Sequence, residues 1–238
     1  MFAWLANPQR FMRFSALALP FFTIAAVTLL AVGWCWALVF SPEDAVQGAT
    51  VRIMYVHVPA AWWAMCIYAF MTVASFIGLV WRHTLADVAA RTAAPIGAAF
   101  AALCLVTGSL WGAPTWGTWW VWDARLTSML ILFLTYIGYI ALWAAVEDEV
   151  KAARLAAILC LAGAINLPIV HFSVTWWSTL HQPSSVLRLG GSSIYPTMLY
   201  PLLVCGLAYG VAFGAFLMAG VRTEIHKRRV QALRRSAR

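Results

Sequence analysis

Two histidines stand out among the residues that could do chemistry, because both lie at the borders of apolar segments. His57, in RIMYVHVPAAWWAM, comes just before Pro59, and His181, in WWSTLHQPSSV, lies in a loop that contains Pro183. One such histidine would suit an interface by itself, since imidazole has an apolar body and a polar tip. Two imidazoles that enter one pocket from different loops can instead take opposite positions on a metal ion. We therefore expect His57 and His181 to be metal ligands.

A tryptophan-rich stretch, WGAPTWGTWWVWDAR at residues 111–125, holds five indoles within twelve positions. Tryptophans at the ends of membrane spans form an aromatic belt, which explains the scattered Trp34, Trp36, Trp62, Trp63, Trp81 and Trp143. A belt explains the dense stretch poorly. We interpret it as an apolar platform for a flat ligand, formed by Trp111, Trp116, Gly117, Trp119, Trp120 and Trp122.

The spacing within this platform would allow one helical face. If the chain after Pro114 is helical, positions i, i+3, i+4 and i+7 bring together Trp116, Trp119, Trp120 and Asp123. Asp123 would then orient an indole N–H or an arginine.

A haem fits both the histidine pair and the platform. Its iron takes two axial ligands, its ring is wide and flat, and its propionates attract cations. Three isolated arginines near these segments could pair with the propionates, namely Arg52, Arg125 and Arg188. Zinc would need further close ligands, and no neighbouring cluster of cysteines or carboxylates supplies them.

Other kinds of chemistry find little support. There is no P-loop, so any coupling to ATP must come from another chain. The five cysteines are far apart and form no C-x-x-C pair, and neither paired carboxylates nor a Ser/His/Asp set is visible. The sequence therefore predicts a binding protein, not an enzyme.

The elements that must position these residues are membrane helices. The 238 residues are 63% hydrophobic and only 10% charged, which cannot form a water-soluble surface. Six charge-free intervals of 21 to 33 residues match the roughly 20 that span a bilayer. We expect helices near Leu17–Phe40, Ala60–Trp81, Ala93–Leu110, Ser128–Val146, Leu155–Val174 and Pro196–Gly220.

Pro59 would then stand in the first turn of the second helix. The first run is about twice the length of a signal peptide's apolar core, so we interpret it as a retained anchor.

The basic residues predict the orientation. Thirteen of the sixteen fall in loops of one side or in the tail 222–238, and that side is expected to be cytoplasmic, with both termini. The tail carries most of the net charge of +8. We expect it to contact anionic lipid or a partner protein, so the charge does not indicate binding of nucleic acid. Residues 1–238 are expected to form one domain with a tryptophan-rich outer loop at 111–126.

The motif W-G-x-x-x-W-G-T-W-W-V-W-D-A-R-L-T-S, which begins at Trp111, resembles the WWD signature of haem-handling membrane proteins of cytochrome c biogenesis. MYVHVPAAW around His57 and VHFSVTWWSTLHQ, which ends near His181, are similar to the cytochrome c maturation protein C, or haem exporter protein C, branch. The resemblance covers nearly the whole chain. Pro183 departs from the family pattern, in which glycine is more common.

This resemblance implies a specific role. Haem b would bind non-covalently at the periplasmic face of the bacterial inner membrane, held by His57 and His181 with the platform, including Asp123 and Arg125. It would pass to a covalent haem chaperone, cytochrome c maturation protein E. The chain would work beside three further cytochrome c maturation proteins: the ATPase, protein A, a second membrane component, protein B, and the small membrane protein D.

Three alternatives remain open. A membrane cytochrome b would carry its histidines within helices, often at two depths. A haem permease would need a polar pathway through its own bundle. A purely structural component would leave the tryptophan-rich stretch unexplained.

Overall fold

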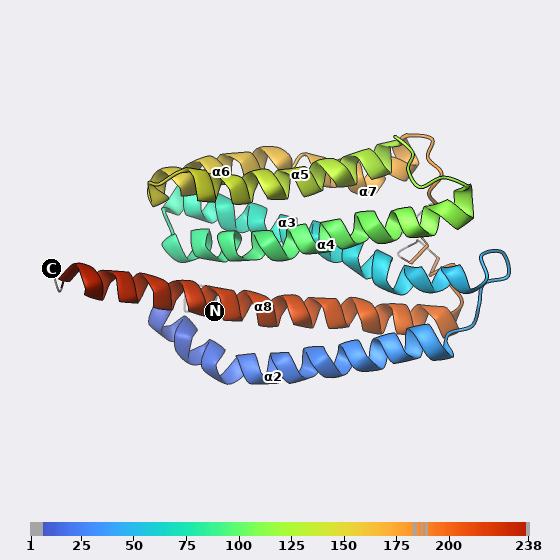
Figure 1. Cartoon of the computed structure of the whole chain (residues 1–238), viewed down its shortest axis with the longest axis horizontal. Coiled ribbons are helices and arrows are strands. Elements are labelled where there is room, and N and C mark those ends of the chain that lie inside the picture. The colour runs from blue at the N-terminus through green and yellow to red at the C-terminus, as the bar shows by residue number, and fades with distance from the viewer. Residues whose placement is uncertain (1–6, 183–184, 187, 189, 237–238) are drawn as a thin grey trace.

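A computed structural model describes residues 7–182, 185, 186, 188 and 190–236, which form an elongated helical bundle (Figure 1). Its α-helices are α2 (Pro8–Cys35), α3 (Met54–Trp81), α4 (Thr84–Trp116), α5 (Ala124–Ala145), α6 (Glu149–Gly163), α7 (Asn166–Trp176) and α8 (Pro196–Ser236). A π-helical segment, η1 (Trp36–Phe40), extends α2, and a 3-10 turn, η2 (Ala49–Ile53), leads into α3. No β-strand occurs in the described residues.

Six helical segments in the described residues are long and apolar enough to cross a bilayer. They are Pro8–Phe40, Ala49–Trp81, Thr84–Trp116, Ala124–Ala145, Glu149–Trp176 and Pro196–Arg234. The fifth combines α6 and α7. The chain is thus an all-α polytopic membrane protein with six transmembrane helices, which confirms the predicted fold class.

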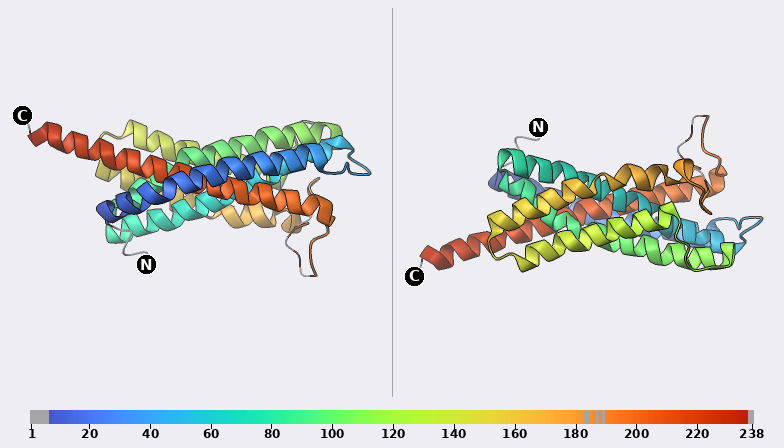
Figure 2. Two further views of the ribbon diagram at one scale, coloured as in Figure 1. Left: turned by 90° about the horizontal axis from the view of Figure 1, so that it is seen from below. Right: turned by 90° about the horizontal axis from the view of Figure 1, so that it is seen from above.

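The helices pack in three tiers (Figures 1 and 2). Helices α2 and α8 pair along one side, α3 and α4 lie in the middle, and α5 covers them together with α6 and α7. Small residues allow the close approaches: Gly97 lies against the ring of Tyr136, and Gly163 against the hydroxyl of Tyr68. Such small residues at helix interfaces are how membrane bundles pack without a hydrophobic driving force between their helices.

Trp63 is not a belt residue. It is half-buried against the core, with its ring centroid 5.9 Å from that of Phe213, and its indole N–H donates to the carbonyl of Gly206 at 2.7 Å. The belt prediction is wrong here because the helix begins earlier than expected, which places Trp63 well inside the span.

The two helices nearest the predicted site are longer than the apolar runs suggest. Helix α3 begins at Met54, so Pro59 is its sixth residue and not part of its first turn. Helix α4 begins at Thr84, nine residues before the predicted start, because Nδ1 of His83 accepts from the amide of Ala86 at 3.2 Å and caps it. It ends at Trp116 and is capped by Gly117, whose φ of 72° suits glycine.

The fifth span is broken, where one continuous helix was expected. Helix α6 ends at Gly163 and α7 begins at Asn166. Pro168 explains the break, because its ring has no N–H to donate to the carbonyl of Ala164, four residues before, and clashes with it.

The last helix continues through the basic tail to Ser236, well beyond the predicted end at Gly220. Residues with high helix propensity fill this segment. Arg222 at its start donates to the carbonyl of Met12 at 2.8 Å and to the hydroxyl of Ser15 at 2.9 Å, which ties α8 to α2.

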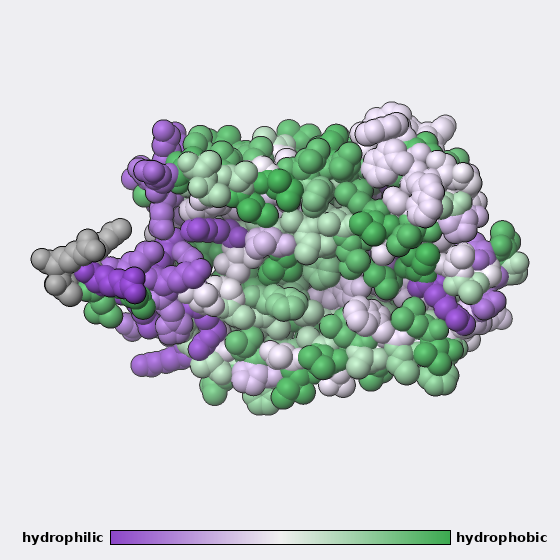
Figure 3. Space-filling model, in the orientation of Figure 1, coloured by the Kyte–Doolittle hydropathy of each residue, from purple (hydrophilic) through white to green (hydrophobic). Residues whose placement is uncertain are grey.

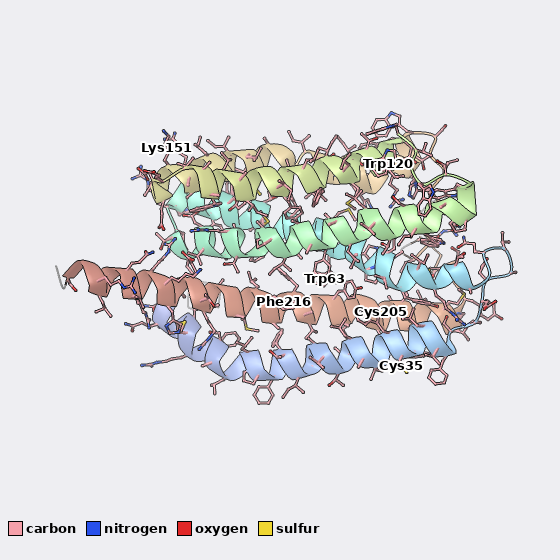
Figure 4. All side chains as sticks on the ribbon, in the orientation of Figure 1. Cys35, Trp63, Trp120, Lys151, Cys205 and Phe216 are labelled. Carbon is pink, nitrogen blue, oxygen red and sulfur yellow. The ribbon has the colours of Figure 1, made fainter. Side chains whose placement is uncertain are left out.

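The two ends of the bundle differ in composition. Hydrophilic residues gather where α2 begins and α8 ends, which we call the basic end, and a broad apolar surface covers the middle (Figure 3). The opposite end carries the loop residues 41–48, the turn η2, the loop residues 117–123 and the described residues of the segment 177–195, and we call it the tryptophan end. Trp120 and Lys151 lie at these opposite ends (Figure 4).

Candidate functional site

His57 lies in the first turns of α3, and its imidazole is fixed against α4. Its Nδ1 is 3.0 Å from the carbonyl of Cys104 and 3.2 Å from Oγ1 of Thr107. The carbonyl can only accept, and the Thr107 hydroxyl already donates to the carbonyl of Leu103 at 2.6 Å. The Nδ1 of His57 therefore carries the proton. Its Nε2 has a free lone pair and no hydrogen-bond partner among the described residues.

His181 is held in the same tautomer by a different group. Its Nδ1 is 3.2 Å from Oδ2 of Asp123, and an ionised carboxylate can only accept. The two side chains are only 18% and 5% exposed, so the contact is well shielded. Its ring meets that of Trp116 edge to face at 4.7 Å. Within the described part of the chain Nε2 of His181 is also unpaired.

Asp123 has two roles. Its Oδ1 accepts from the amide of Leu126 at 2.8 Å and so caps α5, while its Oδ2 holds His181. The start of α5 therefore fixes the position of a histidine that is 58 residues further along the chain. This differs from the expectation that Asp123 orients an indole or an arginine. Metal-binding imidazoles commonly donate their second nitrogen to a carboxylate or a carbonyl, which are the two partners that His181 and His57 have.

Burial keeps His181 neutral. It lowers the pKa of His181 from the ordinary value of 6.5, the charge of Arg125 lowers it further, and Asp123 partly opposes both effects. At pH 7 the imidazole is therefore in the unprotonated form that can bind a metal.

Arg125 lies close enough to both histidines to act on them electrostatically. Its charge acts on both His57 and His181. Among the described residues its guanidinium forms no hydrogen bond and no ion pair within 4.0 Å, although it is partly buried. A half-buried cation without a partner attracts an anionic ligand, since desolvation of a charge is unfavourable unless it is paired.

The tryptophan platform does not lie on one helical face, because α4 ends before it does. Trp111 and Trp116 stand on the last turns of α4, whereas Trp119, Trp120 and Trp122 lie in the loop after Gly117. The predicted i, i+3, i+4, i+7 face is therefore wrong, and 111–126 is not a single loop.

The loop tryptophans form the exposed part of the platform. Trp119 is 62% exposed and Trp122 75% exposed. Trp120 packs edge to face on Trp122 at 5.4 Å, and its buried indole nitrogen has no partner among the described residues. These indoles present an apolar surface that a flat ligand could cover.

The other predicted residues are placed less centrally. Arg52 donates to the carbonyl of Ser41 at 3.4 Å and keeps a buried Nε without a partner among the described residues. Arg188 is exposed. His171 is exposed on α7 and its ring meets that of Phe172 at 4.7 Å. Pro183 lies outside the described residues.

The residues that orient His57 were not found from the sequence. Thr107 could have been noticed as a polar residue inside a span. Gly108 could also have been noticed, because a glycine within a helix often marks a close approach of another group. In the structure the His57 ring fills the space where a Cβ of Gly108 would lie. Cys104 contributes only its carbonyl, which no residue type reveals.

Together these features define a polytopic helical membrane protein with two uncoordinated imidazoles, a cation and exposed indoles at one end of its bundle. A comparison of the chain with protein families matches residues 1–236 to the family described as Heme exporter protein C. The chain belongs to the Heme exporter protein C family.

Individual relatives agree with this assignment. Heme exporter protein C of Bradyrhizobium diazoefficiens is 57% identical over 229 residues, which cover 96% of this chain and 87% of the relative. Heme exporter protein C of Escherichia coli is 54% identical over 198 residues, or 83% of this chain and 80% of the relative. That of Haemophilus influenzae is 45% identical over 230 residues, or 95% and 94%.

Proposed function

We propose that this chain holds haem b non-covalently at the periplasmic face of the bacterial inner membrane. The Nε2 atoms of His57 and His181 bind the iron, and the chain presents the haem to a covalent haem chaperone, cytochrome c maturation protein E, for c-type cytochrome biogenesis. Haem is the cargo, and the chain is one component of an exporter and not an enzyme.

One observation carries this proposal. Two imidazoles from distant parts of the chain each donate through Nδ1 to a protein acceptor, and each leaves Nε2 unpaired among the described residues. A haem iron, whose four equatorial positions are filled by the porphyrin, needs only these two ligands. The described residues contain no group of three or more His, Cys, Asp or Glu that would suit a bare metal ion.

The remaining groups suit the rest of the haem. Arg125 is the best-placed partner for a propionate, because it is partly buried and free of hydrogen bonds within the described residues. Arg52 and Arg188 are the further candidates. The platform residues Trp111, Trp116, Trp119, Trp120 and Trp122, with Gly117, would contact the ring. Because Trp119 and Trp122 are exposed, one haem edge stays accessible for transfer.

The chain would act within a complex. It has no P-loop, so ATP hydrolysis belongs to the ATPase, cytochrome c maturation protein A, which acts with maturation protein B in the membrane and the small membrane protein D. The basic residues of α8 would lie at the cytoplasmic surface, next to anionic lipid.

A loading assay tests the presentation step. The chaperone is co-expressed with the wild-type chain, with His57→Ala or with the control His171→Ala, which alters an exposed histidine on α7. The haem covalently attached to the purified chaperone is then measured. We expect strong loss with His57→Ala and normal loading with the control. Normal loading with His57→Ala would overturn the proposal.

A further inference from the structure

The indole of Trp111 is held by a residue of the first loop at the tryptophan end. Its Nε1–H donates to Oε1 of Gln47 across 2.9 Å, and the two residues are 64 positions apart in the chain. Both side chains are half-buried. Among the tryptophans of the platform, Trp111 is therefore the one that a side-chain hydrogen bond fixes within the described residues.

The loop around Gln47 is itself well ordered by local bonds. The Oδ1 of Asp44 accepts from the amides of Val46 and Gln47, each at 2.9 Å, and these bonds lower the pKa of Asp44, with that from Gln47 the larger cause. Asp44 and Gly48 exchange backbone hydrogen bonds of 3.3 and 2.9 Å, and the φ of 58° at Gly48 suits glycine. The Thr50 hydroxyl donates to the carbonyl of Gln47 at 2.6 Å. The loop thus fixes the backbone from which the Gln47 side chain reaches Trp111.

Trp111 in turn meets His57. The two rings lie edge to face, with centroids 5.8 Å apart and planes at 75°. The His57 ring is anchored through Nδ1 on α4, but an anchor at one atom still allows the ring to tilt. The indole of Trp111 limits that tilt from the next turn of α4, provided that the indole itself cannot turn away.

We propose that Gln47 is a positioning residue for the iron ligand His57, which it reaches through Trp111. The amide fixes the indole, and the indole fixes the plane of the imidazole. This proposal rests on the proposed function, because it takes His57 to be an iron ligand. It assigns to the loop 41–53 a part in haem binding without direct contact between Gln47 and haem.

The hydrogen bond between Gln47 and Trp111 could instead serve only to join the loop to α4. The positioning role and this structural role predict different environments of the haem iron. The electron paramagnetic resonance signal of oxidised low-spin haem depends on the relative planes of its two imidazoles. Loss of a residue that positions one imidazole therefore alters the signal, whereas loss of a purely structural contact does not.

The test uses the full-length chain loaded with haem. The variants are Gln47→Leu, which removes the acceptor at similar volume, Gln47→Glu, which keeps an acceptor, Trp111→Phe, and the Gln47→Leu/Trp111→Phe double variant. Gln9→Leu, at the exposed start of α2, is the matched control.

We expect Gln47→Leu to shift the low-spin signal and to weaken haem retention about fivefold, the effect of one lost hydrogen bond. Gln47→Glu and Gln9→Leu should keep the wild-type signal. The double variant should match Trp111→Phe alone, because Gln47 acts through the indole.

His57→Ala separates the two proposals. If His57→Ala abolishes the low-spin signal while Gln47→Leu leaves it unchanged, Gln47 is a structural staple and this inference is overturned alone. If His57→Ala keeps the wild-type signal, the proposed function falls as well.

Discussion

The basic end and the tryptophan end of the bundle differ in how their charged groups are paired. At the basic end, Arg228 is 3.2 Å from Glu224 and 3.4 Å from Glu149, and Arg91 is 3.6 Å from Glu224 while lying over the ring of Trp143 at 4.6 Å. These four charged side chains therefore form one connected network of ion pairs, which satisfies them without a ligand.

At the tryptophan end the pairing is incomplete. Within the described residues, the guanidinium of Arg125 and the Nε2 atoms of His57 and His181 have no hydrogen-bond partner. The buried indole nitrogen of Trp120 also lacks one, but so does that of Trp143 at the basic end, so the indoles do not distinguish the two ends. Unpaired polar groups close to a membrane interior are unfavourable, so their presence together points to a missing ligand. The contrast between the two ends therefore supports the proposed binding of haem at the tryptophan end.

Beyond the two proposed iron ligands, the largest effect is expected where an unpaired charge is removed from the tryptophan end. Arg125→Leu should lower haem affinity by about tenfold or more, since hydrogen bonds to charged groups contribute roughly 1.5–3 kcal/mol. Arg125→Lys should recover part of the loss, because the charge returns without the guanidinium fork. Haem titration of the purified chain measures this. Arg154→Leu, an exposed arginine at the basic end, is the matched control, and equal effects of the two leucine variants would remove the contrast.

Asp123→Asn should have the next largest effect. Asparagine caps a helix as well as aspartate does, so α5 should still begin at Ala124, while His181 loses its carboxylate. We expect haem affinity to fall about tenfold, as for other partners of metal-binding histidines. Unchanged affinity would mean that Asp123 serves only as a helix cap.

Asp123→Asn should also lower the pKa of His181. Burial already lowers the pKa of His181 below 6.5, and Asp123 opposes that shift. In the haem-free chain His181 should therefore become protonated only as the pH falls below 6.5, and at a still lower pH in Asp123→Asn. Nuclear magnetic resonance of 15N-labelled histidine measures both midpoints. A wild-type midpoint above 6.5 would contradict the described burial.

A smaller effect is expected for single platform indoles. Trp119→Ala and Trp120→Ala should each weaken haem capture about fivefold, roughly 1 kcal/mol, with the axial ligands unchanged. Haem retention and the absorption spectrum measure the two parts of this prediction separately. Trp81→Ala removes an indole that is 65% exposed at the basic end and should retain haem normally. Equal retention in all three variants would restore the aromatic-belt interpretation.

The smallest effect should come from an ion pair at the basic end. Arg228→Ala removes contacts with Glu224 and Glu149, but exposed pairs of this kind contribute less than about 1 kcal/mol. Haem affinity should be unchanged and thermal stability only slightly lower. A clear loss of haem would show that the two ends are coupled.

The sequence predicted the six spans because apolar length alone decides them. It did not predict where helices end, since caps such as His83 and Gly117 carry α4 beyond its apolar run at both sides. A bend in the fifth span is predictable from Pro168, whose missing N–H and bulky ring disturb the preceding turn, although the pattern of apolar residues does not show that the helix breaks fully at Ala164.

The candidate site was predicted only as a set of residue types. His57, His181 and the tryptophans could be selected because their types and loop positions were unusual. Their partners could not, because Asp123 with His181 and Gln47 with Trp111 are contacts between residues far apart in the sequence, which only the packing of the bundle brings together. A backbone carbonyl such as that of Cys104 leaves no trace in the sequence.

The most direct test of haem ligation by His57 and His181 is the absorption spectrum of the purified chain supplied with haem, oxidised and reduced. It should be recorded for the wild type and for His57→Ala, His181→Ala and His171→Ala separately. We predict a bis-histidine spectrum in the wild type and in His171→Ala and its loss in the other two. A wild type that binds no haem, or three variants that all keep the wild-type spectrum, would contradict this ligation.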